Sequence, residues 1–207
     1  INNSTRIIMI NIHTYYKVYS NIIVMLKDRG YKIEKIYKVS FDRFRKKYHD
    51  NDCNIVVTHK KTKNVLLVYF SLHNKNKLQI IKQNITDIFS SNTDKSFSTI
   101  LVLNKKPNNI ILKFINNSDY KQQIEVFWTD ILQINITKHI LQPTFSLLNE
   151  KEKNTLLQQY NIKINQLPKL TIQDPICKYY KFPRLSIVKI VRKNSDSINS
   201  VYYRYVA

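Results

Sequence analysis

The chain has one glycine and two cysteines among its 207 residues. A loop that wraps phosphates needs several glycines, because its backbone amides must approach the ligand closely. That class of nucleotide site is therefore excluded. The two cysteines, Cys53 and Cys177, lie far apart, and we interpret them as reduced core thiols in a reducing compartment rather than as a disulfide framework.

Long hydrophobic runs are also absent. No apolar run approaches the roughly twenty residues that cross a bilayer, and polar groups interrupt the N-terminal segment too early for a signal peptide. The sequence does not begin with methionine, which is compatible with a trimmed or partial start. Because 43% of the residues are hydrophobic and 12% aromatic, we expect a folded, soluble protein.

Acidic residues are scarce, with 14 against 34 basic residues and a formal net charge of +20. Such an excess is typical of proteins that contact nucleic acid or an acidic partner. Lysine, asparagine, isoleucine and tyrosine dominate the composition, as they would in any A/T-rich coding sequence. The excess of positive charge can therefore reflect either contact with a negatively charged partner or compositional drift.

The sequence also lacks recognisable sets of catalytic residues. A metal-dependent nuclease needs carboxylates on two neighbouring strands. Asp52 could supply the first, but residues 65–70 supply no second. The spacing of His49, Cys53 and His59 matches no common zinc pattern. We expect no catalytic residue, no bound metal and no cofactor.

In the first two thirds of the chain, helical and strand patterns alternate. Apolar residues three and four apart over residues 15–26 predict an amphipathic helix that Gly30 closes in a left-handed conformation. Ser40 can cap a second helix. The later elements are a hairpin of residues 53–59 and 64–70, a helix over 77–89, a strand over 98–103, a helix with Pro107 as its first residue, and a strand over 124–128. This alternation predicts an α/β layer.

The last third begins with a capped helix. Asn149 and Glu152 have the spacing of a capping box, and Leu156, Leu157 and Tyr160 form an apolar stripe that needs a partner. The helix should end near residue 161. A short helical turn should follow at residues 174–180, and then two paired strands over 186–193 and 201–206.

Seven blocks then occur in one order: INIT, KHILQP, QYNI, QLPKL, DPICKYY, IVKIVRK and YYRYV. Together they resemble the fifth common subunit of eukaryotic-type DNA-directed RNA polymerases, a family that also has a smaller archaeal homologue. The chain departs from that family at Lys181 and Leu185, where the family has turn glycines, and at Phe145, where it has a histidine. The loop at residues 195–200 also lacks its usual glycine.

A weaker resemblance in the N-terminal part rests on DRGY, DCNIVVTH and the proline after the third strand. It implies the two-domain eukaryotic form, of α/β (α+β) class. Residues 1–133 would be a three-layer α/β jaw domain with a mixed sheet. Residues 134–207 would be a small α+β polymerase-assembly domain.

The resemblance implies a non-catalytic subunit that docks on the largest polymerase subunit and contacts other subunits. The implied docking residues are His139, Pro143, Leu167, Pro168, Asp174, Pro175, Arg192, Tyr203 and Arg204. For Pro168, Pro175 and Tyr203, we slightly favour purely structural roles over docking.

The resemblance also implies non-sequence-specific contact with downstream duplex DNA, and neither a membrane nor a small-molecule substrate. The implied DNA-proximal residues are Asn104, Lys105, Lys106, Pro107 and Asn108. We expect Lys60, Lys61 and Lys63 to face solvent only. The location would be the nucleus or, in a viral lineage, a cytoplasmic transcription compartment or virion. The alternative is a free-standing basic nucleic-acid-binding protein or an inactive nuclease-fold relative.

Overall fold

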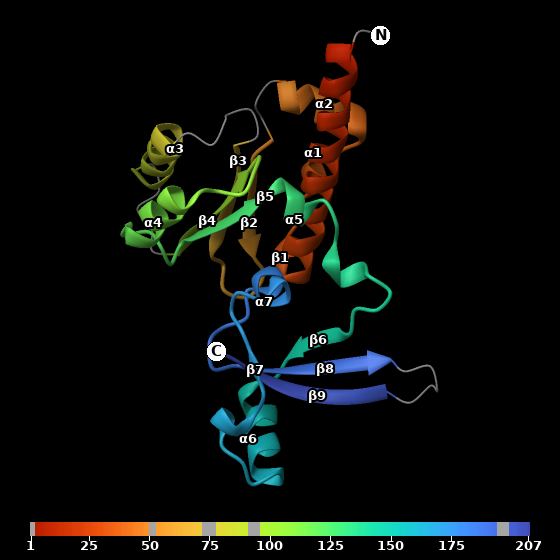
Figure 1. Ribbon diagram of the computed structural model, residues 1–207, viewed down its shortest axis with the longest axis vertical. Helices are drawn as coiled ribbons and strands as arrows, with labels where there is room; N and C mark the ends of the chain where they lie inside the picture. The colour runs from red at the N-terminus through yellow and green to blue at the C-terminus, as the bar shows by residue number, and fades with distance from the viewer. Residues whose placement is uncertain (1–2, 50–52, 72–77, 91–95, 194–198) are drawn as a thin grey trace. The chain divides into compact units, whose positions relative to one another are not determined.

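Two separate β-sheets organise the chain, one within residues 1–134 and one within residues 135–207 (Figure 1). The computed structural model describes residues 3–49, 53–71, 78–90, 96–193 and 199–207. We call the two parts the N-terminal unit and the C-terminal unit. Within the described residues, no helix combines the length and the apolar character needed to cross a membrane.

The N-terminal sheet has the strand order β1-β2-β3-β4-β5. β1 and β2 pair antiparallel, as do β2 and β3, whereas β3, β4 and β5 run parallel. The sheet is therefore mixed, as the resemblance implied. Its strands are β1 (Tyr31–Lys32), β2 (Ile55–His59), β3 (Val65–Ser71), β4 (Phe97–Leu103) and β5 (Ile124–Trp128).

Helices cover both faces of this sheet, which gives the expected three layers (Figure 1). α3 (Leu78–Ser90) and α4 (Asn109–Asn117) pack on the face that contains Leu101 and Leu103. α1 (Asn3–Asp28) packs on the other face, where the Tyr19 and Phe70 rings lie 5.7 Å apart. α2 (Phe41–His49) lies beside α1, and α5 (Thr129–Leu132) follows β5.

A buried ion pair fastens the end of α1 to strand β5. The Arg29 guanidinium donates to both Glu125 carboxylate oxygens, at 2.9 and 3.2 Å, and the two side chains are only 3% and 18% exposed. Gly30 follows with φ +88, so the predicted left-handed closure of α1 is confirmed. This turn directs the chain into β1.

The C-terminal sheet has the order β6-β8-β9-β7. Its strands are β6 (Thr144–Leu147), β7 (Lys169–Leu170), β8 (Ile187–Lys193) and β9 (Asn199–Val206). α7 (Pro175–Tyr180) contributes to the core on one face, which includes Val188 and Ile190. α6 (Glu150–Gln159) contributes to the core on the other face, which includes Ile187 and Tyr205. The assignment of an α+β fold is confirmed.

Three local predictions need correction. α4 begins at Asn109 and not at Pro107, because the Asn108 side chain takes the capping position and accepts from the Ile111 amide at 2.9 Å. Tyr160 is 58% exposed and does not extend the buried stripe, because it follows the last helical residue of α6. α1 begins at Asn3, well before the first residue of the predicted helix.

Two turns keep left-handed backbone angles without glycine. Lys181 has φ +54 at the C-terminal cap of α7, and Leu185 has φ +60 just before β8. Left-handed angles cost a residue with a side chain about 1–2 kcal/mol. Lys181 and Leu185 therefore adopt the left-handed angles themselves and carry strain. In the third glycine-free loop, residues 195–198 lie outside the described residues.

Candidate functional site

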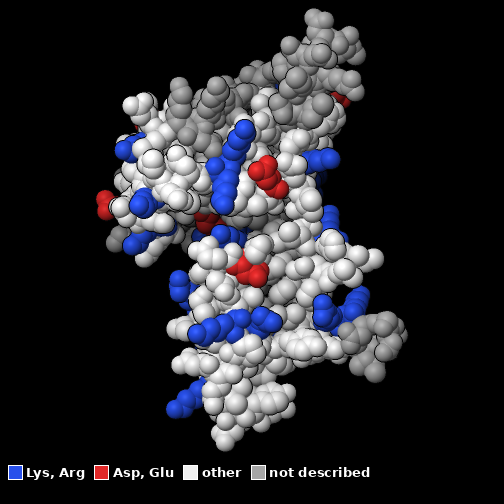
Figure 2. All heavy atoms as spheres, viewed as in Figure 1, with Lys and Arg blue, Asp and Glu red and all other residues white. Residues whose placement is uncertain are grey.

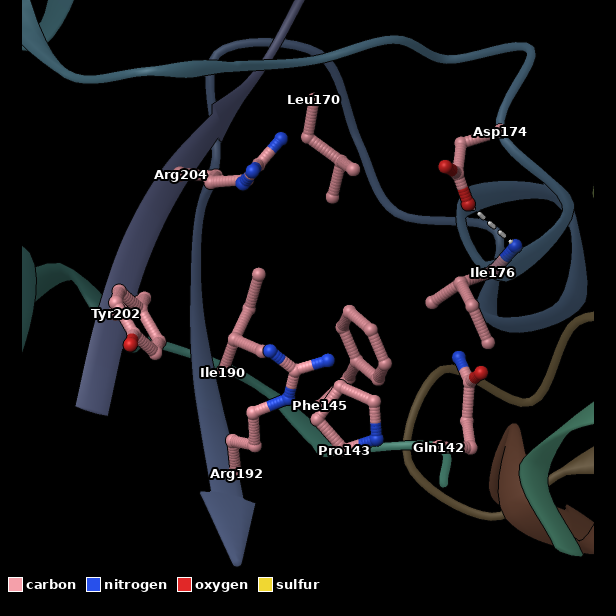
Figure 3. Close-up of a pocket in the computed structure, with 10 residues that line it drawn as sticks. All are labelled: Gln142, Pro143, Phe145, Leu170, Asp174, Ile176, Ile190, Arg192, Tyr202 and Arg204. Carbon is pink, nitrogen blue, oxygen red and sulfur yellow. Dashed lines mark hydrogen bonds between the residues drawn. The ribbon is translucent and has the colours of Figure 1, made fainter. Parts of the chain in front are cut away.

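A groove of about 490 Å³ opens on the α7 face of the C-terminal sheet (Figure 3). Strand register builds its floor: Phe145 on β6 lies opposite Ile190 on β8, and Ile190 lies opposite Tyr202 on β9. Leu170 and Ile176 complete the apolar lining from β7 and α7. We call this surface the assembly groove.

Charged side chains line the rim of the assembly groove. Arg192 and Arg204 share a sheet face with Ile190 and Tyr202, because side chains alternate along a strand. Both arginines are exposed, and Arg204 Nη1 donates to the Lys169 carbonyl at 3.3 Å. The groove therefore has two guanidinium groups on its strand side.

Among the described residues that line the groove, the only carboxylate belongs to Asp174, on the α7 side (Figure 3). Its Oδ1 accepts from the Ile176 amide at 2.8 Å and caps α7. Beneath the groove, burial and then the Asp174 charge raise the pKa of the Cys177 thiol to about 11. Cys177 is 1% exposed, so it is a neutral core thiol.

A tight turn beside the groove presents two aliphatic side chains to solvent. His139 shapes it: its Nδ1 accepts from the Leu141 amide at 3.2 Å, and its carbonyl accepts from the Gln142 amide at 2.9 Å. Ile140 is 94% exposed and Leu141 75%. Gln142 and Pro143, which follow directly, line the groove. The turn therefore presents two exposed aliphatic side chains immediately before residues that line the groove.

The structure gathers only some of the predicted docking residues. Pro143, Asp174, Arg192 and Arg204 line the groove, and His139 shapes the turn beside it. Leu167 and Tyr203 instead pack in the core on the α6 face. Pro168 is exposed and its carbonyl accepts from the Tyr205 amide at 3.0 Å, while Pro175 is the first residue of α7.

Sequence reasoning missed Phe145, Tyr202 and the exposed pair Ile140 and Leu141 as parts of this site. The signal for Tyr202 was present, because the alternation in VYYRYV places it on the same face as Arg204. Two adjacent aliphatic residues between a histidine and a proline were the signal for the turn. The assignment of Phe145 needed the pairing of β6 with β8.

The predicted DNA-proximal loop lies in the N-terminal unit, between β4 and α4. Asn104 faces inward: its Oδ1 accepts from the Tyr15 hydroxyl at 3.0 Å and its carbonyl accepts from the Thr129 hydroxyl. Pro107 is buried, and Asn108 caps α4. These three residues hold the loop in shape.

The remaining two loop residues, Lys105 and Lys106, are exposed directly before the α4 N-terminus. No acidic residue occupies the first turn of α4, so the backbone amides and the lysines act in the same electrostatic direction. Figure 2 shows lysine and arginine side chains spread over the visible face of each unit, with few carboxylates among them.

Among the described residues, no three His, Cys, Asp or Glu side chains are grouped to hold a metal ion. Asp52 and the side chain of His49, which were considered as possible metal ligands, lie outside the described residues. Cys53 is buried, and His59 Nδ1 accepts from the Thr62 amide at 3.1 Å.

Two family models match the chain. The model described as RNA polymerase Rpb5, C-terminal domain, matches residues 134–206, and that described as RNA polymerase Rpb5, N-terminal domain, matches residues 10–88. An Arabidopsis thaliana protein named DNA-directed RNA polymerase V subunit 5A is 33% identical over 201 residues, which cover 94% of this chain and 88% of the relative. The chain belongs to the Rpb5 family of RNA polymerase subunits.

A second Rpb5-family relative is the Caenorhabditis elegans protein named DNA-directed RNA polymerases I, II, and III subunit RPABC1. It is 27% identical over 202 residues, which cover 92% of this chain and 94% of the relative. The resemblance stated from the seven blocks is confirmed. The assembly groove lies wholly within the segment matched by the Rpb5 C-terminal model, whereas Lys105 and Lys106 lie in neither matched segment.

Proposed function

We propose that the chain is a non-catalytic small subunit of a multisubunit DNA-directed RNA polymerase. Its C-terminal domain, residues 134–207, docks on the largest subunit. Its N-terminal domain, residues 1–133, forms part of the lower jaw near downstream DNA. The observation that carries this proposal is the assembly groove with Ile140 and Leu141 exposed beside it.

The surface around the groove has the composition of a protein interface. Interfaces have an apolar centre and a polar rim, and arginine and tyrosine are enriched in them relative to the rest of the protein surface. The floor here is formed by Phe145, Ile190 and Tyr202, and the rim carries Arg192 and Arg204. Contiguous exposed apolar surface marks an interaction site in a folded protein. This composition supports docking on another subunit.

The DNA part of the proposal rests on Lys105 and Lys106. Exposed lysines next to a helix N-terminus favour a phosphate, because the free backbone amides and the side chains both attract negative charge. Phosphate contacts position a protein on DNA without reading its sequence. The lysine pair would therefore hold incoming duplex at any sequence.

The role is architectural, and the nucleus is the proposed location. The names of the relatives as subunits of polymerase V and of polymerases I, II and III support it. A viral origin would move the same role to a cytoplasmic transcription compartment or virion. Neither location changes the proposed contacts.

Affinity purification of the tagged full-length chain at moderately high salt tests the proposal, with a mock purification from untagged cells as the control. We expect the two largest polymerase subunits to co-purify at near-equal stoichiometry. Salt weakens purely electrostatic binding, so retention would indicate docking through apolar contacts. Recovery of the tagged chain without them would instead favour the free-standing nucleic-acid-binding protein or inactive nuclease relative.

A further inference from the structure

We infer that the assembly groove binds an extended segment of the partner subunit that inserts one large apolar side chain and places a carboxylate against Arg192 and Arg204. The inference rests on the proposed function and specifies the chemistry of the docked segment. Three features of the groove support it: its size, its apolar floor and its uneven charge.

The size fits one large side chain together with the backbone on either side. A benzene-sized ring fills an engineered cavity of about 150 Å³, whereas the groove measures about 490 Å³. Its floor is a row of Phe145, Ile190 and Tyr202 across three strands. An aliphatic or aromatic side chain would bury apolar surface against this row.

The charge of the groove selects an acidic segment. Among the described residues, Arg192 makes no ion pair and Arg204 donates only to the Lys169 carbonyl. An aspartate or glutamate can accept two parallel hydrogen bonds from a guanidinium group. Asp174, the single acidic residue that the structure describes in the lining, already accepts from the Ile176 amide on the opposite side (Figure 3).

The same arginines could attract a nucleic-acid phosphate. Stacking of a base on Tyr202, which is 53% exposed, would then be the expected contact. The apolar floor argues against that occupant, because Phe145, Leu170 and Ile190 offer no side-chain hydrogen-bond partner to base edges. A peptide with both an apolar and an acidic side chain uses every part of the groove.

Site-specific cross-linking in the assembled complex tests the inference. The photoreactive residue p-benzoylphenylalanine replaces Tyr202 in the tagged full-length chain, and mass spectrometry identifies the attached peptide. We expect a peptide of the largest subunit that has an Asp or Glu within a few residues of an apolar attachment point. The control places the probe at Val201, whose side chain points to the other sheet face, and should not capture this peptide.

Attachment to nucleic acid, attachment to a peptide with no nearby carboxylate, or the same peptide from both positions would overturn the inference. A wild-type chain that never co-purifies with the largest subunit would instead refute the proposed function. The two failures are therefore distinguishable.

A matched charge reversal provides the second test. Arg192→Glu should lower the amount of largest subunit retained through a salt wash about tenfold or more. The change replaces a cation at the groove rim with an anion that repels the carboxylate of the docked segment. Lys193→Glu makes the same charge change one residue along, on the opposite sheet face, and should alter retention less than about twofold. Circular dichroism checks that both variants fold. Equal losses, or no loss from Arg192→Glu, would count against the inference.

Discussion

The assembly groove and the Lys105–Lys106 loop both present exposed cations, but their surroundings differ. The arginines of the groove border an apolar floor and stand opposite one carboxylate. In the loop, Asn104 and Asn108 are engaged in internal hydrogen bonds and Pro107 is buried, so the lysines are the exposed cations at the start of α4. The groove can select a partner by shape and charge together, whereas the loop can offer only charge.

Salt should separate the two surfaces. Exposed charges are screened within about 10 Å at 0.1 M ionic strength, while apolar burial is not weakened by salt in this way. Contacts of the loop should therefore weaken as salt rises, and contacts of the groove should largely persist. The variants described next change the groove side, the loop, or the stability of one unit with both surfaces left in place.

The largest effect should come from Glu125→Ala, which destabilises the N-terminal unit and leaves the residues of both surfaces unchanged. Removing one partner leaves Arg29 buried and uncompensated, so we expect a loss of about 3 kcal/mol in the free energy of unfolding. Urea unfolding followed by the fluorescence of Trp128, the single tryptophan, measures it. Docking through the groove should persist, because the groove lies wholly within the C-terminal unit.

Asp119→Ala is the control for this change. Asp119 is an exposed acid in the same unit, so its loss should shift the free energy of unfolding by less than about 0.5 kcal/mol. Similar losses from the two variants would show that the buried ion pair has no special role.

The next effect should come from Ile140→Ser combined with Leu141→Ser. We expect docking on the polymerase to weaken by about 2 kcal/mol, roughly 30-fold, because two aliphatic side chains no longer bury apolar surface. The stability of the free chain should hardly change, since both side chains are already exposed in it. Competition binding with wild-type chain measures the docking affinity.

Ile36→Ser is the matched control for the turn. Ile36 is 62% exposed in the N-terminal unit, and its replacement should leave docking unchanged. An equal weakening by Ile36→Ser would place the decisive apolar contact outside the groove.

The lysine loop should give a smaller change that depends on salt. Log affinity for duplex DNA falls as log salt rises, by about 0.9 per phosphate contact. Lys105→Ala combined with Lys106→Ala should make this negative slope shallower by about 2. Titration of the assembled polymerase with duplex at several salt concentrations measures the slope. Assembly itself should stay intact.

Lys60→Ala combined with Lys61→Ala removes the same charge from the β2–β3 hairpin loop, where both lysines are exposed. This pair should leave the slope unchanged. A loss of assembly in the Lys105 and Lys106 variant would show that the loop is structural, and equal slopes for the two variants would indicate that only net charge matters.

The smallest effect should be a gain. Leu185→Gly should raise the stability of the C-terminal unit by about 1 kcal/mol, because glycine adopts φ +60 without strain. The Leu185 side chain is 59% exposed, so little packing is lost. Thermal unfolding followed by circular dichroism should show a rise of about 4–8 °C per kcal/mol for a unit of this size. Leu185→Ala keeps the Cβ atom, and a similar rise in that variant would contradict the strain argument.

Local chemistry explains which parts of the fold were predictable. The capping box of Asn149 and Glu152 forms as its spacing required, with bonds of 2.8 and 2.9 Å, because both partners lie three residues apart. Asp174 likewise caps a helix that begins with Pro175. The error at Pro107 was also local: proline and asparagine both suit a helix start, and the side chain of Asn108 decides between them.

Short edge strands were less predictable. β6 and β7 span four and two residues, too few for a clear alternating pattern, and both form by pairing with strands distant in sequence. The groove depends on them, because Phe145 comes from β6 and Leu170 from β7. The individual docking residues could be proposed from their motifs, but their division between two sheet faces could not.

The sequence by itself determined the caps, the long strands, the excess of positive charge and the family, since these depend on neighbouring residues or on the order of motifs. Only the tertiary structure decided that Pro143, Arg192 and Arg204 share one groove while Leu167 and Tyr203 face the opposite core. The reason is geometric. Strand pairing and alternation place residues that are distant in the sequence side by side, and they send immediate neighbours to opposite faces.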